Sequence, residues 1–308
     1  MADLFFILTD IILPIFILMA IGYYLQLTFK LDLSTLAKLN IYFLVPGFIF
    51  VKLYEATFSY SLFLYVLLFF ILLVVILFII SVVVRKLLGM KNGEETTFSN
   101  SIMFFNSGNY GVPVNDLVFR GDPFAMSIQV IVLMLQNIFL FSYGIFSLRA
   151  AAEGKLKAAL GYFKMPVLYA MIAGIVLNGL EINIPEFIWV PANYIADAMI
   201  GIALITLGAQ VQNMKVKVIL PSVYISVFLR LIGGPIAALI IIYLFKIDGL
   251  IAQAFLIASA MPTSVNSAVI AQEYNNHQDL AAQTVLISTL ISSVTVTLVI
   301  FVARTLFG

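Results

Sequence analysis

Apolar residues are gathered into ten runs of roughly twenty residues, and short polar connections separate each run from the next. A helix of about 20 apolar residues is long enough to cross the hydrocarbon core of a bilayer. The predicted spans are residues 4–27, 35–54, 59–84, 99–119, 124–149, 160–180, 190–210, 218–245, 250–272 and 280–305. The pattern therefore predicts an all-α polytopic membrane protein, a single transmembrane unit over residues 1–308 with no separate soluble domain.

Two of these runs carry polar and helix-breaking residues where the others are almost uniformly apolar. The fourth reads F-F-N-S-G-N-Y-G-V-P-V-N-D from Phe104 to Asp116, and the ninth reads A-M-P-T-S-V-N from Ala260 to Asn266. Unpaired backbone groups are costly in hydrocarbon, so an interrupted helix persists only inside protein or beside a water-filled cavity. One interrupted span in each half of a membrane protein indicates the substrate site of a transporter.

Composition agrees with this class and excludes others. Hydrophobic residues make up 63% of the chain and charged residues 10%, and the mean hydropathy is +1.13. A net charge of +1 provides no basic surface for nucleic acid, and the lack of cysteine removes disulfides and thiolate metal sites. The first run has no basic segment or small-residue cleavage site, so we interpret it as a retained span.

Basic residues are distributed unevenly between the two faces of this arrangement. The connections after the first, third, fifth and seventh spans carry 11 Lys and Arg residues, whereas the opposite face carries 4. Because basic connections stay on the cytoplasmic side, both termini are expected outside.

Five spans in each half cross the membrane in opposite senses, which predicts an inverted repeat of residues 1–150 and 160–308. The spacing of two residue pairs agrees with this repeat. Pro14 and Gly22 in the first span are 8 residues apart, as are Pro166 and Gly174 in the sixth.

The prolines of the two interrupted spans are expected to mark the breaks. A new half-helix exposes N–H groups with no partner and a partial positive charge, which suits a carboxylate. The candidate substrate-binding residues are Asn109, Pro113, Val114, Asn115, Pro262, Thr263, Ser264 and Asn266. The alternative is that the amides and hydroxyls only join helices. Pro14, Pro46 and Pro166 lack polar neighbours, and we interpret them as kinks.

A second set of polar residues is a candidate for lining the cavity or coupling transport to an ion. These residues are Asn106, Asp116, Gln129, Gln136, Asn137 and Arg230. Asp116 either carries a proton or a cation near the crossing or lies near the outer interface. The three amides of the fifth span either contact substrate or join helices. Arg230 either pairs with an acidic residue or supplies positive charge to an anion pathway.

Three functions are compatible with the sequence. The first is a secondary carrier for a small organic anion, because the interrupted spans have neutral polar linings and no ATP-binding loop is present. The second is a receptor that binds a small acid without transporting it. The third is an intramembrane enzyme, but Asp10, Asp116 and Asp197 lie in three different spans and the lone histidine, His277, lies in a connection. Coupling to sodium or protons and the presence of a metal stay undecided, and no cofactor is expected.

The chain resembles the auxin efflux carrier family, which includes bacterial malate and malonate permeases. The resemblance rests on N-x-G-x-P in the fourth span, A-M-P-T-S-V-N in the ninth and V-L-I-S-T-L-I-S-S from Val285 to Ser293, and it covers essentially the whole chain. It implies a fold like that of sodium/proton antiporters, with broken helices 4 and 9 crossing near the bilayer midplane. It further implies a scaffold of spans 1, 2, 6 and 7, a transport domain of spans 3–5 and 8–10, and a homodimer through the scaffold. The substrate is then a small carboxylate, and the location a bacterial inner or plasma membrane.

Overall fold

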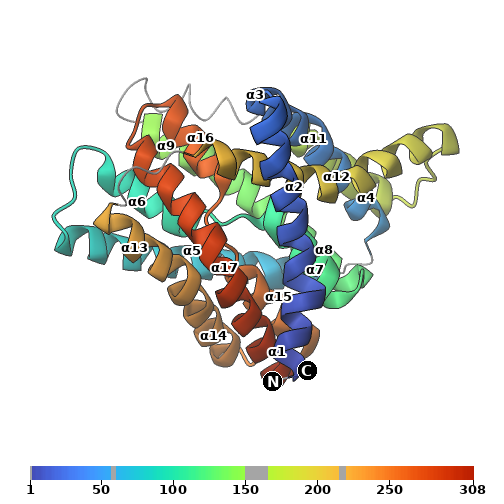
Figure 1. Ribbon diagram of the computed structural model, residues 1–308. Coiled ribbons are helices and arrows are strands. Elements are labelled where there is room, and N and C mark those ends of the chain that lie inside the picture. Colours follow the sequence, from blue (N-terminus) through green and yellow to red (C-terminus); the bar gives the residue numbers. More distant parts are fainter. Residues whose placement is uncertain (1, 57–59, 150–165, 215–219) are drawn as a thin grey trace.

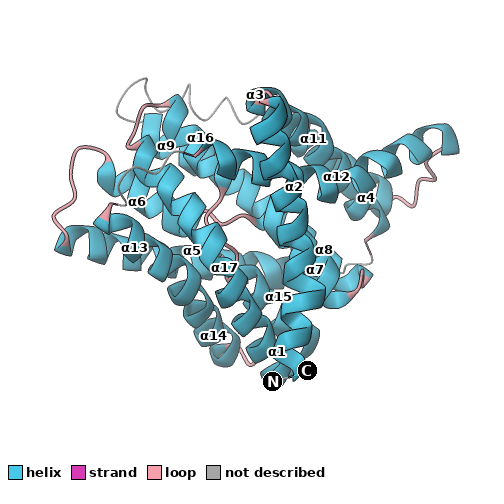
Figure 2. Ribbon diagram, viewed as in Figure 1, coloured by secondary structure: helices cyan, strands magenta, loops and turns pink. Residues whose placement is uncertain are grey.

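A computed structural model describes residues 2–56, 60–149, 166–214 and 220–308. Across these residues the secondary structure is helical, apart from one isolated β-bridge between Phe105 and Thr263 (Figure 2). The two chain ends lie side by side at the bottom of the molecule, where α1 contacts α17 (Figure 1). The prediction of an all-helical protein is therefore confirmed.

Seven helices in the described residues are long and apolar enough to cross a membrane, and they match seven of the predicted spans closely. Four contain a short π-helical segment, labelled η. Their elements are α1 (Ala2–Phe6), η1 (Ile7–Ile12) and α2 (Leu13–Phe29); α3 (Leu33–Leu39), η2 (Asn40–Leu44) and α4 (Val45–Glu55); α5 (Tyr60–Leu87); α8 (Pro123–Phe139), η4 (Leu140–Gly144) and α9 (Ile145–Arg149); α12 (Glu186–Asn213); α13 (Pro221–Phe228), η6 (Leu229–Gly233) and α14 (Gly234–Leu244); and α17 (Gln278–Phe307).

The other described helices are shorter. The fourth predicted span consists of α6 (Glu94–Met103), η3 (Ser107–Gly111) and α7 (Val112–Phe119), and the ninth of α15 (Gly249–Ser259) and α16 (Val265–Glu273). The sixth corresponds to α11 (Pro166–Gly179), and the start of its predicted range, residues 160–165, lies outside the described residues.

Four of the π segments end two residues before a proline: Pro14, Pro46, Pro113 and Pro235. Proline has no backbone N–H, and its ring crowds the preceding turn of a helix. A π turn relieves this conflict by widening the helix locally, so the helix bends without ending. Pro113 therefore belongs with the kink prolines Pro14 and Pro46, and it does not mark a break in the chain.

The first, second, sixth and seventh predicted spans pack through glycines. Helix α2 packs along α12, where a Cβ at Gly22 would collide with the Ile205 carbonyl and one at Gly208 with the Met19 carbonyl. Helix α11 packs on α4, and a Cβ at Gly174 would lie 2.9 Å from the Phe50 carbonyl oxygen. Small residues allow membrane helices to approach this closely, and dispersion contacts then hold them together.

A stripe of large apolar side chains is exposed along α5, at Leu64, Leu68, Ile71, Val75 and Ile79. Their spacing of three to four residues places them on one helix face. In water such a face would be an aggregation site, whereas in a bilayer it contacts lipid. The exposed stripe is therefore the surface expected of a membrane-spanning helix.

Candidate functional site

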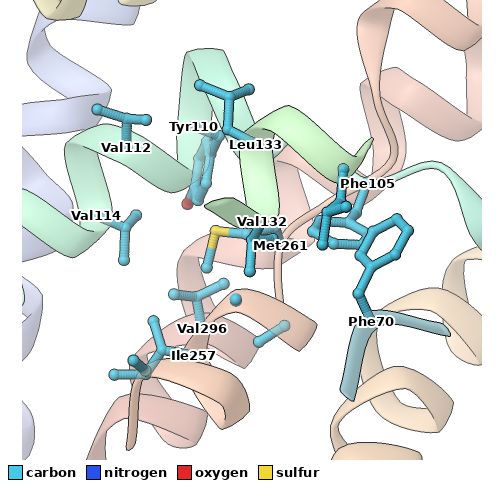
Figure 3. Packing of buried hydrophobic residues seen from close by; sticks show 14 of the residues in the cluster. Phe70, Phe105, Tyr110, Val112, Val114, Val132, Leu133, Ile257, Met261 and Val296 are labelled. Atoms are coloured by element: carbon cyan, nitrogen blue, oxygen red, sulfur yellow. The ribbon is translucent and has the colours of Figure 1, made fainter. Parts of the chain in front are cut away.

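The two interrupted helices meet at their breaks. Residues 104–106 separate α6 from η3, and residues 260–264 separate α15 from α16. The Asn106 N–H donates to the Pro262 carbonyl at 2.8 Å, and the Ser264 N–H donates to the Phe104 carbonyl at 2.8 Å. These two bonds flank the Phe105–Thr263 bridge symmetrically. We call this junction the crossover, and Figure 3 shows Phe105 and Met261 from its two segments in one buried cluster.

The first break is organised by Asn106 and not by Pro113. Asn106 is the N-cap residue of the following helix, and its Oδ1 accepts from the Asn109 N–H at 3.1 Å. This bond fixes the orientation of the amide, so the buried Nδ2 is a donor, and it has no partner in the described residues. Pro113 lies inside the continuous η3–α7 helix. Our expectation of a break at Pro113 is therefore wrong.

The same correction applies to Val114 and Asn115. Both lie in α7, which continues η3 without a break, so their backbone N–H groups do not form the first turn of the half-helix. The side chain of Asn115 is buried, and its Oδ1 has no partner within the described part of the chain. The N-terminal end of this half-helix is instead at Ser107, whose N–H donates to the Phe105 carbonyl at 2.9 Å.

The second break includes Pro262, as expected. The Thr263 Oγ1 donates to the Ser101 carbonyl at 2.8 Å, and the Thr263 N–H donates to the Ser288 Oγ at 3.1 Å. Ser264 is the N-cap residue of α16, and its side chain makes no capping bond. Asn266 lies in the first turn of α16, partly exposed. Pro262, Thr263, Ser264 and Asn266 therefore all lie at this break or in the turn after it.

Arg230 is fully buried on η6, and it contacts both interrupted helices. Its Nη1 donates to the Ile102 carbonyl at 2.8 Å, and its Nη2 donates to the Ser259 carbonyl. The guanidinium carbon lies 5.2 Å from the centre of the Phe105 ring. Backbone carbonyls thus take the place of the acidic partner that we considered from the sequence.

The three amides of the fifth span differ in their surroundings. Gln129 is buried, and its Nε2 donates to the Ser107 carbonyl at 2.7 Å, so it contacts the start of the second half-helix. Gln136 is buried, and neither atom of its amide has a partner in the described residues. Asn137 is also buried. Gln129 is therefore the amide whose contact with the crossover is direct.

Asn109 connects the crossover to the second span. Its Oδ1 accepts from the Asn40 Nδ2 at 3.2 Å, across 69 residues of sequence. The sequence did not single out Asn40. It also did not single out Ser288 on α17, whose Oγ accepts from the Thr263 N–H at the second break. Ser288 lies within the V-L-I-S-T-L-I-S-S motif, whose hydroxyls were the available signal.

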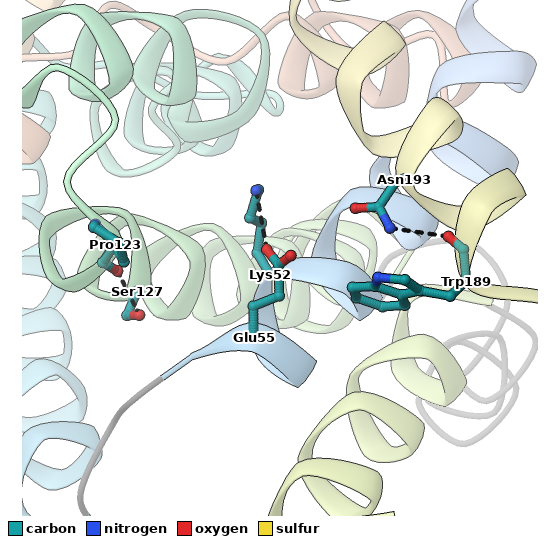
Figure 4. Close-up of polar contacts among 6 residues, drawn as sticks. All are labelled: Lys52, Glu55, Pro123, Ser127, Trp189 and Asn193. Atoms are coloured by element: carbon teal, nitrogen blue, oxygen red, sulfur yellow. Dashed lines mark hydrogen bonds and ion pairs between the residues drawn. The ribbon is translucent and has the colours of Figure 1, made fainter. Parts of the chain in front are cut away.

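Asp116 lies away from the crossover, at two cavities between α7 and the first, second and seventh spans. A cavity of 480 Å³ is lined by Asp10 and Asp116, and one of 300 Å³ by Asp116 and Asp197. Lys52 and Glu55 also line the second cavity and form an ion pair of 3.3 Å (Figure 4). The position of Asp116 near the end of α7 fits the interfacial alternative. Acidic and histidine side chains of the described residues form no group of three suited to a metal ion.

The crossover thus combines two helix N-terminal ends with neutral amide and hydroxyl side chains. The two N-terminal ends attract negative charge, and the Asn106 Nδ2 offers a donor to an oxygen atom. Such an arrangement suits an anionic group.

Comparison with known proteins identifies the family of this chain. The family described as membrane transport protein matches residues 7–300. The chain is 25% identical over 301 residues to an uncharacterized transporter of Methanothermobacter thermautotrophicus, with 94% of this chain and 96% of that protein covered. It is 27% identical over 205 residues to the uncharacterized transporter YfdV of Escherichia coli K12, with 64% of each chain covered. The chain therefore belongs to the membrane transport protein family, which confirms the resemblance to auxin efflux carriers.

Proposed function

We propose that this protein is a secondary active transporter that moves a small organic acid anion, with the substrate bound at the crossover of the fourth and ninth predicted spans. The observation that carries the proposal is the joining of two interrupted helices, backbone to backbone, beside the buried Nδ2 of Asn106, which has no partner among the described residues. Buried polar groups are normally satisfied, so an unpaired donor at a helix N-terminus favours a bound acceptor there.

Ten spans and an inverted repeat are part of this proposal. Seven long helices, α11 and the two interrupted helices together account for the ten spans. The symmetric pair of bonds around the Phe105–Thr263 bridge supports the repeat. Gly22 and Gly174, which correspond in the two halves, both pack against a backbone carbonyl of a neighbouring helix.

We further propose that spans 1, 2, 6 and 7 form a scaffold, through which two copies pair, and that spans 3–5 and 8–10 move against it like an elevator. The packing of α2 on α12 and of α11 on α4 supports the first group. The bond between Asn40 and Asn109 crosses from the proposed scaffold to the proposed transport domain, and the movement would have to break it. A single interhelical hydrogen bond between side chains contributes about 0.6 kcal/mol in a membrane, so breaking it presents a small barrier to the movement.

The crossover is proposed to hold one carboxylate of the substrate. Each half-helix N-terminus contributes about half an elementary positive charge, and the neutral side chains nearby fix orientation without adding charge. A dicarboxylate of the malate or malonate type meets these requirements.

Uptake by purified protein in liposomes tests this function. We expect the wild type to accumulate labelled malonate or malate, and Asn109→Ala and Asn266→Ala to reduce uptake at least about tenfold while the protein stays folded. Asn193→Ala is the matched control, because its Nδ2 donates to the Trp189 carbonyl within α12, away from the crossover (Figure 4). Binding of these acids without flux would favour the receptor alternative. Unchanged uptake in both variants would overturn the site assignment.

The proposed orientation, with both termini outside, can be tested independently because the chain has no cysteine. A membrane-impermeant maleimide applied to intact cells should label Gly308→Cys and leave Asn92→Cys unlabelled until the membrane is opened. The reverse pattern would invert the topology.

A further inference from the structure

Arg230 is a buried cation whose partners are backbone carbonyls. The ion pair between Lys52 and Glu55 is the one identified within the described residues, so no carboxylate there pairs with Arg230. Burying an unpaired charge is expensive, and proteins usually avoid it or compensate it. The position of Arg230 therefore requires a compensating feature, which its two bonds identify.

In both bonds, Arg230 supplies a donor in place of a backbone N–H that the break has removed from the helix. In an uninterrupted helix, the Ile102 carbonyl would accept from the N–H of residue 106, and the Ser259 carbonyl from the N–H of residue 263. The Asn106 N–H donates instead to Pro262, and the Thr263 N–H donates to Ser288. The two guanidinium nitrogens donate to these two carbonyls instead, so one side chain caps the C-terminal ends of both α6 and α15.

The capping also balances charge. A helix C-terminus carries about half a negative charge, so two of them offset about one guanidinium charge. The N-terminal ends of η3–α7 and α16 then remain uncompensated, and together they amount to about one positive charge. Without Arg230, the four helix ends would cancel and the crossover would attract an anion far less.

We propose that Arg230 is the fixed counter-charge of the crossover: by neutralising both half-helix C-termini, it leaves the paired N-termini able to bind one carboxylate. It is a positioning residue, because it acts through the two half-helices without touching the substrate. This inference rests on the proposed function, and it adds the source of the charge selectivity. A purely structural cap would stabilise the fold but would not set the affinity for anions.

The test compares Arg230→Lys and Arg230→Gln in the full-length protein by malonate binding, measured by calorimetry or ligand-induced thermal shift. The lysine keeps the charge but loses the forked geometry, whereas glutamine keeps polar contacts and loses the charge. We expect the malonate Kd of Arg230→Lys to stay within about fivefold of wild type and that of Arg230→Gln to rise at least about thirtyfold.

Arg304→Gln is the matched control. Arg304 also caps a half-helix, since its Nη2 donates to the Val118 carbonyl near the end of α7, but it lies far along that helix from the crossover. Its removal should leave the malonate Kd within about twofold of wild type, because a helix-end charge acts mainly over one turn.

The possible outcomes separate this inference from the proposed function. Wild-type affinity in folded Arg230→Gln, or equal losses in the Lys and Gln variants, would overturn the role of Arg230 while malonate binding by the wild type still upheld the transporter proposal. If Arg230→Gln does not fold, Arg230→Lys decides alone: near-wild-type Kd supports the inference, and a tenfold or larger loss overturns it. Failure of the wild type to bind any tested acid would instead overturn the proposed function.

Discussion

The crossover and the seam between α2 and α12 both bring two backbones into direct contact, but by opposite means. At the seam, unbroken helices approach because Gly22 and Gly208 have no side chain, and the contact is made by carbonyl groups of the neighbouring helix. At the crossover, the helices are broken, and hydrogen bonds between Asn106, Pro262, Phe104 and Ser264 join the chain segments.

The difference concerns how each region is held together. The seam depends on close packing of the two helix backbones, and it tolerates little change in shape. The crossover is held by hydrogen bonds between backbone groups. Two buried polar atoms there, the Asn106 Nδ2 and the Ser101 Oγ, have no hydrogen-bond partner within the described residues. A rigid seam and a polar junction are the two components that the proposed elevator requires. Four predictions test whether the regions differ in this way.

The largest effect is expected on stability, from Gly208→Ala. Its new Cβ would collide with the Met19 carbonyl, so α2 and α12 would have to separate, at a cost of about 3 kcal/mol or more. Thermal unfolding in detergent should show a clear loss of stability. Gly201→Ala on the same helix is the control, because a Cβ there meets no atom within 4 Å and should leave stability within about 1 kcal/mol. Equal stability of the two variants would contradict a tightly packed seam.

The next effect is on anion affinity, from Asn106→Asp. The carboxylate retains an acceptor for the Asn109 N–H and suits a helix N-terminus, but it replaces the free Nδ2 donor with negative charge. We expect malonate to bind about 100-fold more weakly through charge repulsion, whereas the melting temperature stays near that of wild type. Asn106→Ser, which keeps a cap and adds no charge, should lose less affinity. A wild-type Kd in Asn106→Asp would remove Asn106 from the site.

The third prediction compares the two prolines of the interrupted spans. Pro262 lies in the break, so Pro262→Ala permits α15 to continue and should cost most of the uptake, since proline disfavours that continuation by about 3 kcal/mol. Pro113 follows a π turn inside a continuous helix, so Pro113→Ala should reduce uptake by about threefold or less. Initial uptake rates in liposomes measure both, and a larger loss for Pro113→Ala would contradict the location of the break.

The smallest effect is expected from Thr263→Val, a substitution of similar shape. It removes the Oγ1 donor from the buried Ser101 carbonyl, at a cost of about 1–2 kcal/mol. Thr284→Val is the comparison, because its Oγ1 donates to the Leu280 carbonyl within its own helix and should cost less. Chemical or thermal unfolding of the two variants provides the measurement. A larger loss for Thr284→Val would show that the bond across the crossover contributes little.

The sequence predicted the helical class, seven of the spans and the presence of two interruptions, because these depend on local composition. Hydropathy over twenty residues identifies a span, and clustered polar residues within it identify a defect, wherever the helices lie in space. The residues of the second break were identified correctly for the same reason, since Pro262 both ends a helix and lies among Thr263 and Ser264.

The first break was placed wrongly because a proline in sequence has two structural outcomes. Pro113 is accommodated by the π turn of η3, while Phe104–Asn106 leave the helical conformation because the Phe104 carbonyl and the Asn106 N–H bond to the other broken helix. The sequence around Phe104–Asn106 does not show where the helix breaks, because the residues that pair with this segment lie about 160 residues away along the chain.

The sequence by itself determined that this chain is a membrane protein with two interrupted spans, since insertion into lipid depends on local composition, and its motifs carried the resemblance to the family. Only the tertiary structure decided which atoms compensate those defects. The backbone groups released by one break are paired by the other, and Arg230 caps both helices from a third span, a choice set by contacts between residues far apart in sequence.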